Sequence, residues 1–176
     1  AVQSYLQAEA RKGTTGDPVI TTFAGPTATS PYHGGVLAPN GKIYANPYFA
    51  TFNMEIDPAT DSFTTSGTAP GTGTHAGGTL AANGKIYWSP YTPSGSLPRI
   101  LEPPSTVTFS TGATNTTTSA ILGMTVSPHG YIYGIPHYET GVLKLDPNTV
   151  QHSYFGSFAG VGKWGGALLA PNGKIY

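Results

Sequence analysis

The sequence predicts an all-β fold built from repeated four-stranded antiparallel units, and three observations lead to this prediction. The 176 residues include 24 glycines and 16 prolines, a composition that suits short strands separated by tight turns. No long stretch carries an apolar stripe at the 3.6-residue period of a helix. A phrase written Asn-Gly-Lys-Ile-Tyr, or a close variant of it, recurs along the chain at regular intervals.

The recurring phrase divides most of the chain into four copies of one unit. The copies align on a turn glycine, and successive turn glycines are 43, 46 and 43 residues apart: Gly41, Gly84, Gly130 and Gly173. A period of about 40 to 50 residues is typical of propeller blades and of some helical arrays, and the missing helical stripe excludes the arrays. The sequence therefore predicts a β-propeller of about four blades in residues 17–176, with blades that begin near residues 34, 77, 123 and 165.

The first two strands of each unit form the inner hairpin of a blade. In the first copy we expect strands at 34–38 and 42–48, joined by a tight turn at Asn40-Gly41, because both turn residues tolerate positive φ. Each first strand opens on a pair that begins with glycine, Gly34-Gly35 in this copy, and three of the four pairs are Gly-Gly. First strands crowd around the axis of a propeller, so residues with little or no side chain let the backbones approach one another there.

The third and fourth strands follow at 52–57 and 62–67 in the first copy. An acid-proline turn joins them, because proline sets φ and the acidic side chain can bond the backbone. The same turn recurs in the next two copies at Glu102-Pro103 and Asp146-Pro147. Residues 1–16 precede the repeats, and we expect them to form a short helix or a divergent strand.

The pattern "LAPNGKIY…P-Y…DP-T" resembles the repeat of bacterial secreted β-propeller proteins, akin to Kelch, NHL-type and gluconolactonase-like propellers. The resemblance covers nearly the whole chain after about residue 17. It implies the architecture and a secreted or cell-surface location, but no single activity, because propellers carry many unrelated functions.

The two ends of the sequence suggest how the ring closes. The last copy has only its inner hairpin, and residues 17–25, "DPVITTFAG", align with the outer-half sequence "DPATDSFTT" at 57–65. We expect residues 3–25 to complete the last blade as a clasp, because an unpaired strand edge is a template for another strand. Two alternatives stay open: the same segment of a second molecule completes the blade, giving an oligomer or filament, or the chain is part of a longer propeller.

Charge excludes several classes of partner. Eight basic and eight acidic residues give no net charge, which argues against nucleic acid and against a polybasic membrane contact. No apolar run approaches the roughly 18 residues of a membrane span. The absence of cysteine excludes disulfides and thiolate metal sites. Composition and resemblance together predict a secreted or cell-surface protein.

We expect no catalytic residues, no metal and no cofactor. Half of the acids belong to acid-proline turns, and the remainder, Glu9, Glu55, Asp61 and Glu139, are scattered over different loops and strands. Metal-dependent lactonases and paired-acid glycosidases need carboxylates that converge. The Asn-Gly-Lys turns lead into strands rather than helices, so they do not match a phosphate-binding loop.

Aromatic and histidine side chains provide the strongest signal for a binding site. They follow the second strand or precede the first strand of each blade, and these two sets of loops share one face of a propeller. Exposed rings with polar tips suit sugars or a protein surface, although packing between blades also uses such rings. The candidates are Tyr32, His33, Tyr48, His75, Tyr91, His137, Tyr138, Lys163 and Trp164.

These observations favour a non-catalytic binding or structural module with a carbohydrate or protein ligand on the aromatic loops. Two alternatives remain: a subunit that assembles by strand exchange, and a gluconolactonase-like enzyme that carries a metal in its central funnel. Asn115 lies in the one Asn-x-Ser/Thr acceptor and is a candidate for glycosylation in a secreted protein.

Overall fold

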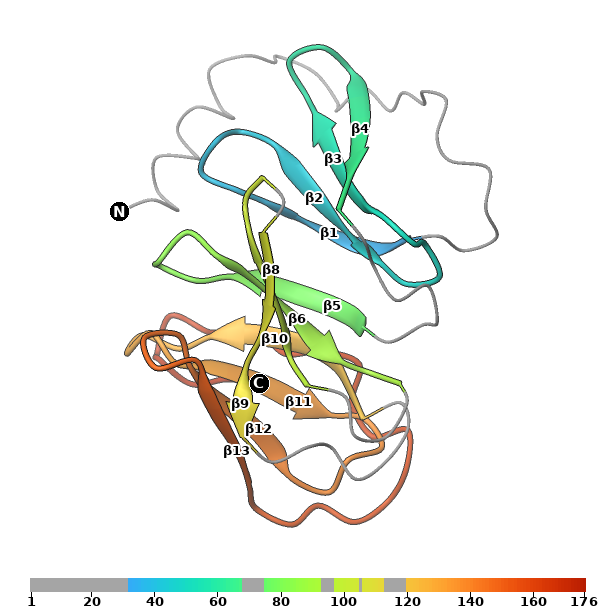
Figure 1. Cartoon of the computed structure of the whole chain (residues 1–176). Helices are drawn as coiled ribbons and strands as arrows, with labels where there is room; N and C mark the ends of the chain where they lie inside the picture. Colours follow the sequence, from blue (N-terminus) through green and yellow to red (C-terminus); the bar gives the residue numbers. More distant parts are fainter. Residues whose placement is uncertain (1–31, 68–74, 93–96, 105, 113–119) are drawn as a thin grey trace, which may run out of the picture.

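A computed structural model of the chain describes residues 32–67, 75–92, 97–104, 106–112 and 120–176 (Figure 1). Within these ranges the structure is all-β, with thirteen strands and no helix, as predicted. No described helix could therefore cross a membrane. The N-terminal segment 1–16, the expected clasp at residues 3–25 and Asn115 lie outside the described residues.

Three antiparallel sheets correspond to the first three copies of the repeat, and we call them the first, second and third blades. The first blade has the order β1-β2-β3-β4, with β1 at Tyr32–Leu37, β2 at Ile43–Pro47, β3 at Asn53–Asp57 and β4 at Ser62–Ser66. The second has the order β5-β6-β7-β8, with β5 at His75–Leu80, β6 at Ile86–Pro90, β7 at Arg99–Glu102 and β8 at Thr106–Phe109. The four-stranded meander is therefore confirmed as the unit.

The third blade contains one strand more than predicted. Its meander runs β10 at Ile121–Val126, β11 at Ile132–Pro136, β12 at Val142–Asp146 and β13 at Gln151–Phe155. The short strand β9, Thr111–Gly112, continues from the second blade and pairs in parallel with β13. It links two successive blades at their outer edge.

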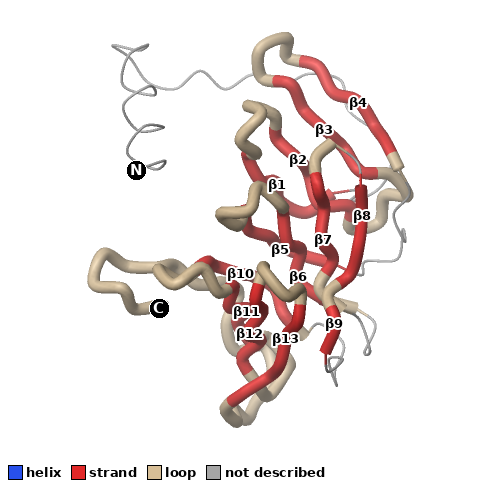
Figure 2. Tube along the Cα trace, turned by 60° about the vertical axis from the view of Figure 1, so that its left-hand side comes forward, coloured by secondary structure: helices blue, strands red, loops and turns tan. Residues whose placement is uncertain are grey.

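The fourth copy is represented by an inner hairpin. Leu169 pairs with Ile175, and the backbone groups of Leu168 and Tyr176 exchange hydrogen bonds of 3.0 and 3.1 Å. The blades fan out from the side where β1, β5 and β10 lie, and the C-terminal hairpin continues this series beside β10 (Figure 2).

The inner hairpin turn has three residues, 39–41, as the predicted strand bounds leave, but positive φ at both Asn40 and Gly41 was expected and is found at one of them. The amide of Ala38 donates to the carbonyl of Lys42 and the amide of Gly41 donates to the carbonyl of Ala38, and the other three copies repeat both bonds. Only the turn glycine has positive φ, +80° at Gly41, whereas Asn40 does not. The asparagine is instead held by its side chain, because Asn40 Oδ1 accepts from the Lys42 amide and Asn40 Nδ2 donates to the Tyr44 hydroxyl.

The acid-proline turn forms as predicted from its side-chain chemistry. Asp57 Oδ1 accepts from the amide of Ala59 at 2.9 Å, and Asp146 Oδ1 accepts from the amide of Asn148 at the same distance. These bonds satisfy a backbone donor at the start of each turn, and they explain why an acid precedes the proline.

The predicted close approach of the inner strands is present between neighbouring blades. A Cβ added at Gly77 would lie 2.7 Å from the carbonyl oxygen of Leu122 in the next blade, and one at Gly123 would lie 2.8 Å from Gly166 Cα. A Cβ at Gly78 would instead overlap the indole of Trp88 in its own sheet. The glycines therefore serve two kinds of contact, one between blades and one within a blade.

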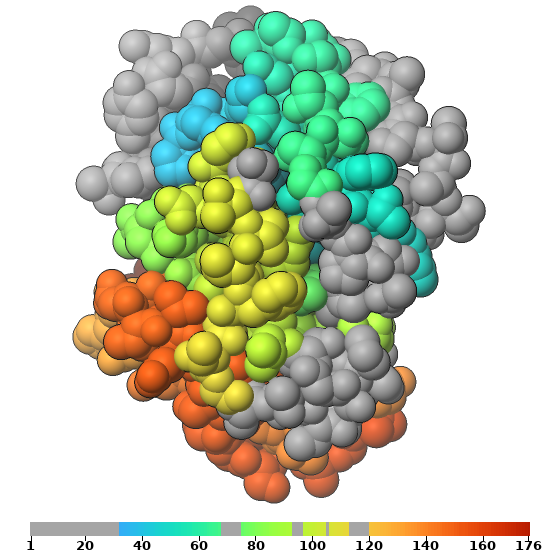
Figure 3. Space-filling view, viewed as in Figure 1, coloured from blue at the N-terminus to red at the C-terminus, as the bar shows by residue number. Residues whose placement is uncertain are grey.

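The apolar core lies between the sheets, which adjoin one another as successive bands in Figure 3. Ala38 and Tyr44 of the first blade pack with Ile86, Trp88 and Leu101 of the second. A second cluster joins the second and third blades, and its buried members are Ala81, Tyr87, Ile100, Ala120, Ile121, Met124, Ile132, Leu143 and Leu145. Blades that bury their faces against neighbours in this way are the packing units of a propeller.

Candidate functional site

The predicted binding loops gather at one end of the blades, which we call the loop face. Tyr32 pairs with Pro47, His75 with Pro90 and Ile121 with Pro136, so each first strand begins where the second strand of its blade ends. The loops before first strands and after second strands must therefore lie at the same end. The hairpin turns around Gly41 and its equivalents lie at the opposite end.

One aromatic cluster joins the first and second blades on the loop face. The ring of Tyr48 lies 5.6 Å from His33, 4.6 Å from Phe49 and 5.9 Å from Tyr91, measured between ring centroids. His33 and Phe49 are exposed, and both tyrosines are partly buried. Burial and the neighbouring Tyr91 hydroxyl raise the pKa of Tyr48, so its hydroxyl stays protonated near neutral pH. We call these four residues the tyrosine cluster.

Three members of this cluster, His33, Tyr48 and Tyr91, were predicted from the sequence, and Phe49 was not. Its neighbour Tyr48 was a candidate because it directly follows the repeated proline, whereas Phe49 stands one residue further along, at the position that Thr92 fills in the second copy and Tyr138 in the third. The structure leaves 48% of Phe49 exposed and sets its ring edge-on to Tyr48, at 75° between planes. Tyr32 stands at the start of β1 and is half-buried, which raises the pKa of its hydroxyl.

A second cluster lies on the loops around the third blade. The rings of His137 and Tyr138 are 4.7 Å apart, and those of Phe158 and Trp164 are 5.7 Å apart and nearly perpendicular. The amide of Lys163 donates to the carbonyl of His137 at 3.0 Å, which ties the two loops together. Phe158 was not predicted from the sequence, because it precedes the fourth copy in a loop without a repeated pattern.

His75 does not lie on the exposed loop face, although it was one of the nine candidates. It is only 3% exposed, its Nε2 lies 3.1 Å from the carbonyl oxygen of Leu97, and its ring is 6.2 Å from Phe109. Burial, and to a smaller degree the charge of Arg99, lowers its pKa to about 4. The equivalent positions in other copies are Tyr32 and the buried Ile121, and this register indicates an interior position.

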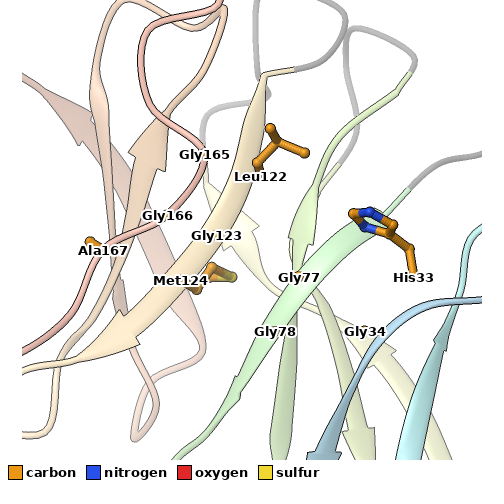
Figure 4. A pocket seen from close by; sticks show the side chains of 10 residues that line it. All are labelled: His33, Gly34, Gly77, Gly78, Leu122, Gly123, Met124, Gly165, Gly166 and Ala167. Carbon is orange, nitrogen blue, oxygen red and sulfur yellow. The ribbon is translucent and has the colours of Figure 1, made fainter.

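A cavity of about 360 Å³ lies among the inner strands of all four copies (Figure 4). Glycine backbone makes up most of its wall, and Leu122, Met124 and Ala167 add apolar surface. His33 is the one titratable residue among those that line it, and it also belongs to the tyrosine cluster. Among the described residues no group of three His, Asp or Glu side chains is placed to hold a metal ion.

A buried cation that was not among the predicted site residues, Arg99, lies near the loop face. Arg99 is 1% exposed, and its Nη2 donates to Oδ1 of Asn53, which is 2% exposed. Burial lowers the pKa of Arg99 to about 10. Arg99 begins β7 and Asn53 begins β3, so both lie near the loops that carry the tyrosine cluster.

Comparison with solved structures identifies the fold. Virginiamycin B lyase from Staphylococcus aureus superposes with a TM-score of 0.66 over 83% of this chain, at 12% sequence identity and covering 48% of the lyase. An auxiliary nutrient binding protein from Bacteroides ovatus superposes with a TM-score of 0.62 at 14% sequence identity. The match covers 81% of this chain and 34% of the binding protein. A putative gluconolactonase superposes with a TM-score of 0.57 at 14% sequence identity. The match covers 82% of this chain and 56% of the gluconolactonase.

These likenesses show a β-propeller fold and include both enzymes and binding proteins. The chain spans about half the length of the lyase it matches. No model of a known protein family matches the chain, and no curated protein matches it either. The propeller prediction is thus confirmed at the level of fold, whereas no match supports the specific repeat type.

Proposed function

We propose that the protein is a non-catalytic propeller of the cell surface or extracellular space that binds a carbohydrate on its loop face. The tyrosine cluster carries this proposal, because two blades together present four rings, three of them packed around Tyr48, and all four are at least partly open to solvent. Rings in that state offer an apolar face to the CH groups of a sugar, and the Tyr and His tips offer hydrogen bonds to its hydroxyls.

The cluster is also preorganised, which favours binding. Tyr48 packs against three other rings, so its orientation is set before a ligand arrives, and little side-chain freedom remains to be lost on binding. A protein ligand would use the same rings as anchors. The resemblance of the fold to a nutrient binding protein supports a binding role, and the low charge of the chain supports a ligand with few charged groups.

An enzyme is the second candidate, and the central cavity favours it. The cavity volume of about 360 Å³ lies in the usual range for a small-molecule site. The structures similar to this chain also include a lyase and a putative gluconolactonase, which are named as enzymes. Elemental analysis of the purified protein separates the two functions. Stoichiometric bound metal would favour the gluconolactonase-like enzyme.

Glycan-array screening followed by calorimetry tests the binding proposal. We expect one or more oligosaccharides to bind the wild type, and Tyr48→Ala to weaken that binding at least tenfold because it removes the ring at the centre of the cluster. Tyr131→Ala is the matched control: Tyr131 lies at the opposite end of the third blade, beneath the Lys144 ammonium, and its loss should leave binding unchanged. Equal effects of the two changes, or no glycan bound at all, would contradict the proposal.

A further inference from the structure

At the junction of the first and second blades, Arg99 and Asn53 form one bonded pair, and each of them also has a buried hydrogen-bond donor without a partner among the described residues. Arg99 Nη2 is occupied by Asn53 Oδ1, but Arg99 Nη1 and Asn53 Nδ2 are both inaccessible to solvent and unbonded. Buried polar groups form hydrogen bonds in the great majority of proteins, and burying a charged guanidinium costs more free energy than burying a neutral group unless a partner balances its charge. Two adjacent donors in this state point to an acceptor that binds between the blades.

No carboxylate among the described residues compensates the charge of Arg99. The ion pairs in this part of the chain join Lys42 to Glu55 and Asp57, and Lys85 to Glu102. The neighbouring His75 is neutral at pH 7 because its pKa is about 4, and the carbonyl of Leu97 faces that ring. The guanidinium is therefore a buried positive charge near a neutral imidazole.

Packing of the blades does not require this arginine. The strand register shows which residues occupy the position of Arg99 in the other blades. Met54 is its equivalent in the first blade and Leu143 in the third. Both equivalents are apolar, and Leu143 belongs to the core between blades. Apolar side chains thus fill this position in the sister repeats, so the charge of Arg99 calls for an explanation other than packing.

We propose that Arg99 and Asn53 form a binding site for a carboxylate at the junction of the first and second blades. A carboxylate offers two acceptor oxygens in one plane, which matches the fork of a guanidinium, and Asn53 Nδ2 adds a further donor. The carboxylate comes either from a small free anion or from an acidic sugar held on the loop face above, since Asn53 ends the loop that carries Tyr48 and Phe49.

Thermal unfolding of the wild type in formate tests this site. Sodium formate, compared with sodium chloride at equal concentration, should raise the Tm along a saturable curve, because a ligand that binds only the folded state stabilises it. Asn53→Asp supplies a carboxylate from within the chain beside Arg99. This variant should melt above the wild type in chloride and should no longer respond to formate.

Two further arms identify the source of the carboxylate and separate this site from the proposed function. Arg99→Met, which copies Met54 of the first blade, should abolish the formate response. Tyr48→Ala should retain it, whatever its effect on glycan binding. If the wild type binds uronate-containing oligosaccharides more strongly than neutral ones, and Arg99→Met loses this preference, the carboxylate belongs to the sugar. If the wild type responds to formate but shows no such preference, the site binds a free anion. A wild type indifferent to formate, or an Asn53→Asp variant less stable than the wild type in chloride, would overturn the inference.

Discussion

Acidification should weaken the interior of the second blade through His75. This ring is buried, and its pKa is lowered from 6.5 to about 4. Once the chain unfolds, water solvates the imidazole and its pKa returns to the ordinary value. The unfolded state therefore binds a proton more readily than the folded state between pH 6.5 and pH 4, and stability that is present above this window is lost as the pH falls through it.

The size of the loss follows from the two pKa values. With one site at 6.5 unfolded and about 4 folded, the free energy of unfolding falls by about 2 kcal/mol between pH 7 and pH 5, and by about 3 kcal/mol once pH 4 is reached. Folding stabilities of single domains are commonly about 5–15 kcal/mol, so a loss of this size is readily measured. The lowered pKa of the Glu55 carboxyl, bonded to Lys42, adds its own loss mainly below pH 4.5.

Urea unfolding of the wild type and of His75→Gln at pH 7 and pH 5 measures this contribution. The glutamine can still donate to the Leu97 carbonyl but does not titrate, so its variant should lose about 2 kcal/mol less than the wild type over this interval. His33→Gln, at an exposed position, is the control and should behave as the wild type does. An equal loss in wild type and His75→Gln would refute the reasoning.

Two further predictions concern the glycines and the closure of the ring. Gly78→Val should destabilise the fold by about 3 kcal/mol or more, because the new side chain overlaps the buried Trp88. Gly35→Val should destabilise it by only about 1 kcal/mol, because the new Cβ meets a side-chain methyl of Ile43 at 3.1 Å. Equal melting temperatures for the two variants would contradict this ranking. Deleting residues 1–25 should cause aggregation or loss of folding if that segment completes a blade, and light scattering with circular dichroism checks it; a truncated chain that stays monomeric and equally stable would exclude both kinds of clasp.

The blade architecture could be predicted because the sequence pattern of one blade recurs in four copies. Each copy carries its turn glycine and its inner strand pair, and most copies carry the acid-proline turn, so errors at one position are corrected by the others. The turn was located correctly, but the expectation of positive φ at Asn40 was wrong. The dipeptide Asn-Gly is compatible with turns that have positive φ at one residue or at both, and the side-chain bond from Asn40 to the Tyr44 hydroxyl that favours asparagine here depends on the folded hairpin.

The site could be predicted only in part, because packing between blades does not follow from the repeat. The loops that carry Tyr48 and Tyr91 were located from blade topology, but the contact of these rings depends on how two blades meet. His75 was expected on the surface, whereas its alignment with Ile121 in the third blade marks an interior position. Arg99 gave no signal at all, because a single arginine after a proline-rich loop has many ordinary explanations, and only its burial distinguishes it.

The most direct test of the proposed function is to map a bound oligosaccharide on the protein by NMR. Backbone amide shifts would be recorded while the best glycan from the array is titrated into the wild type. The account predicts the largest changes at residues 32–33, 48–49 and 91, where the loops of two blades bring the tyrosine cluster together. Changes centred instead on the hairpin turns near Gly41 and Gly84, at the opposite end of the blades, would contradict it.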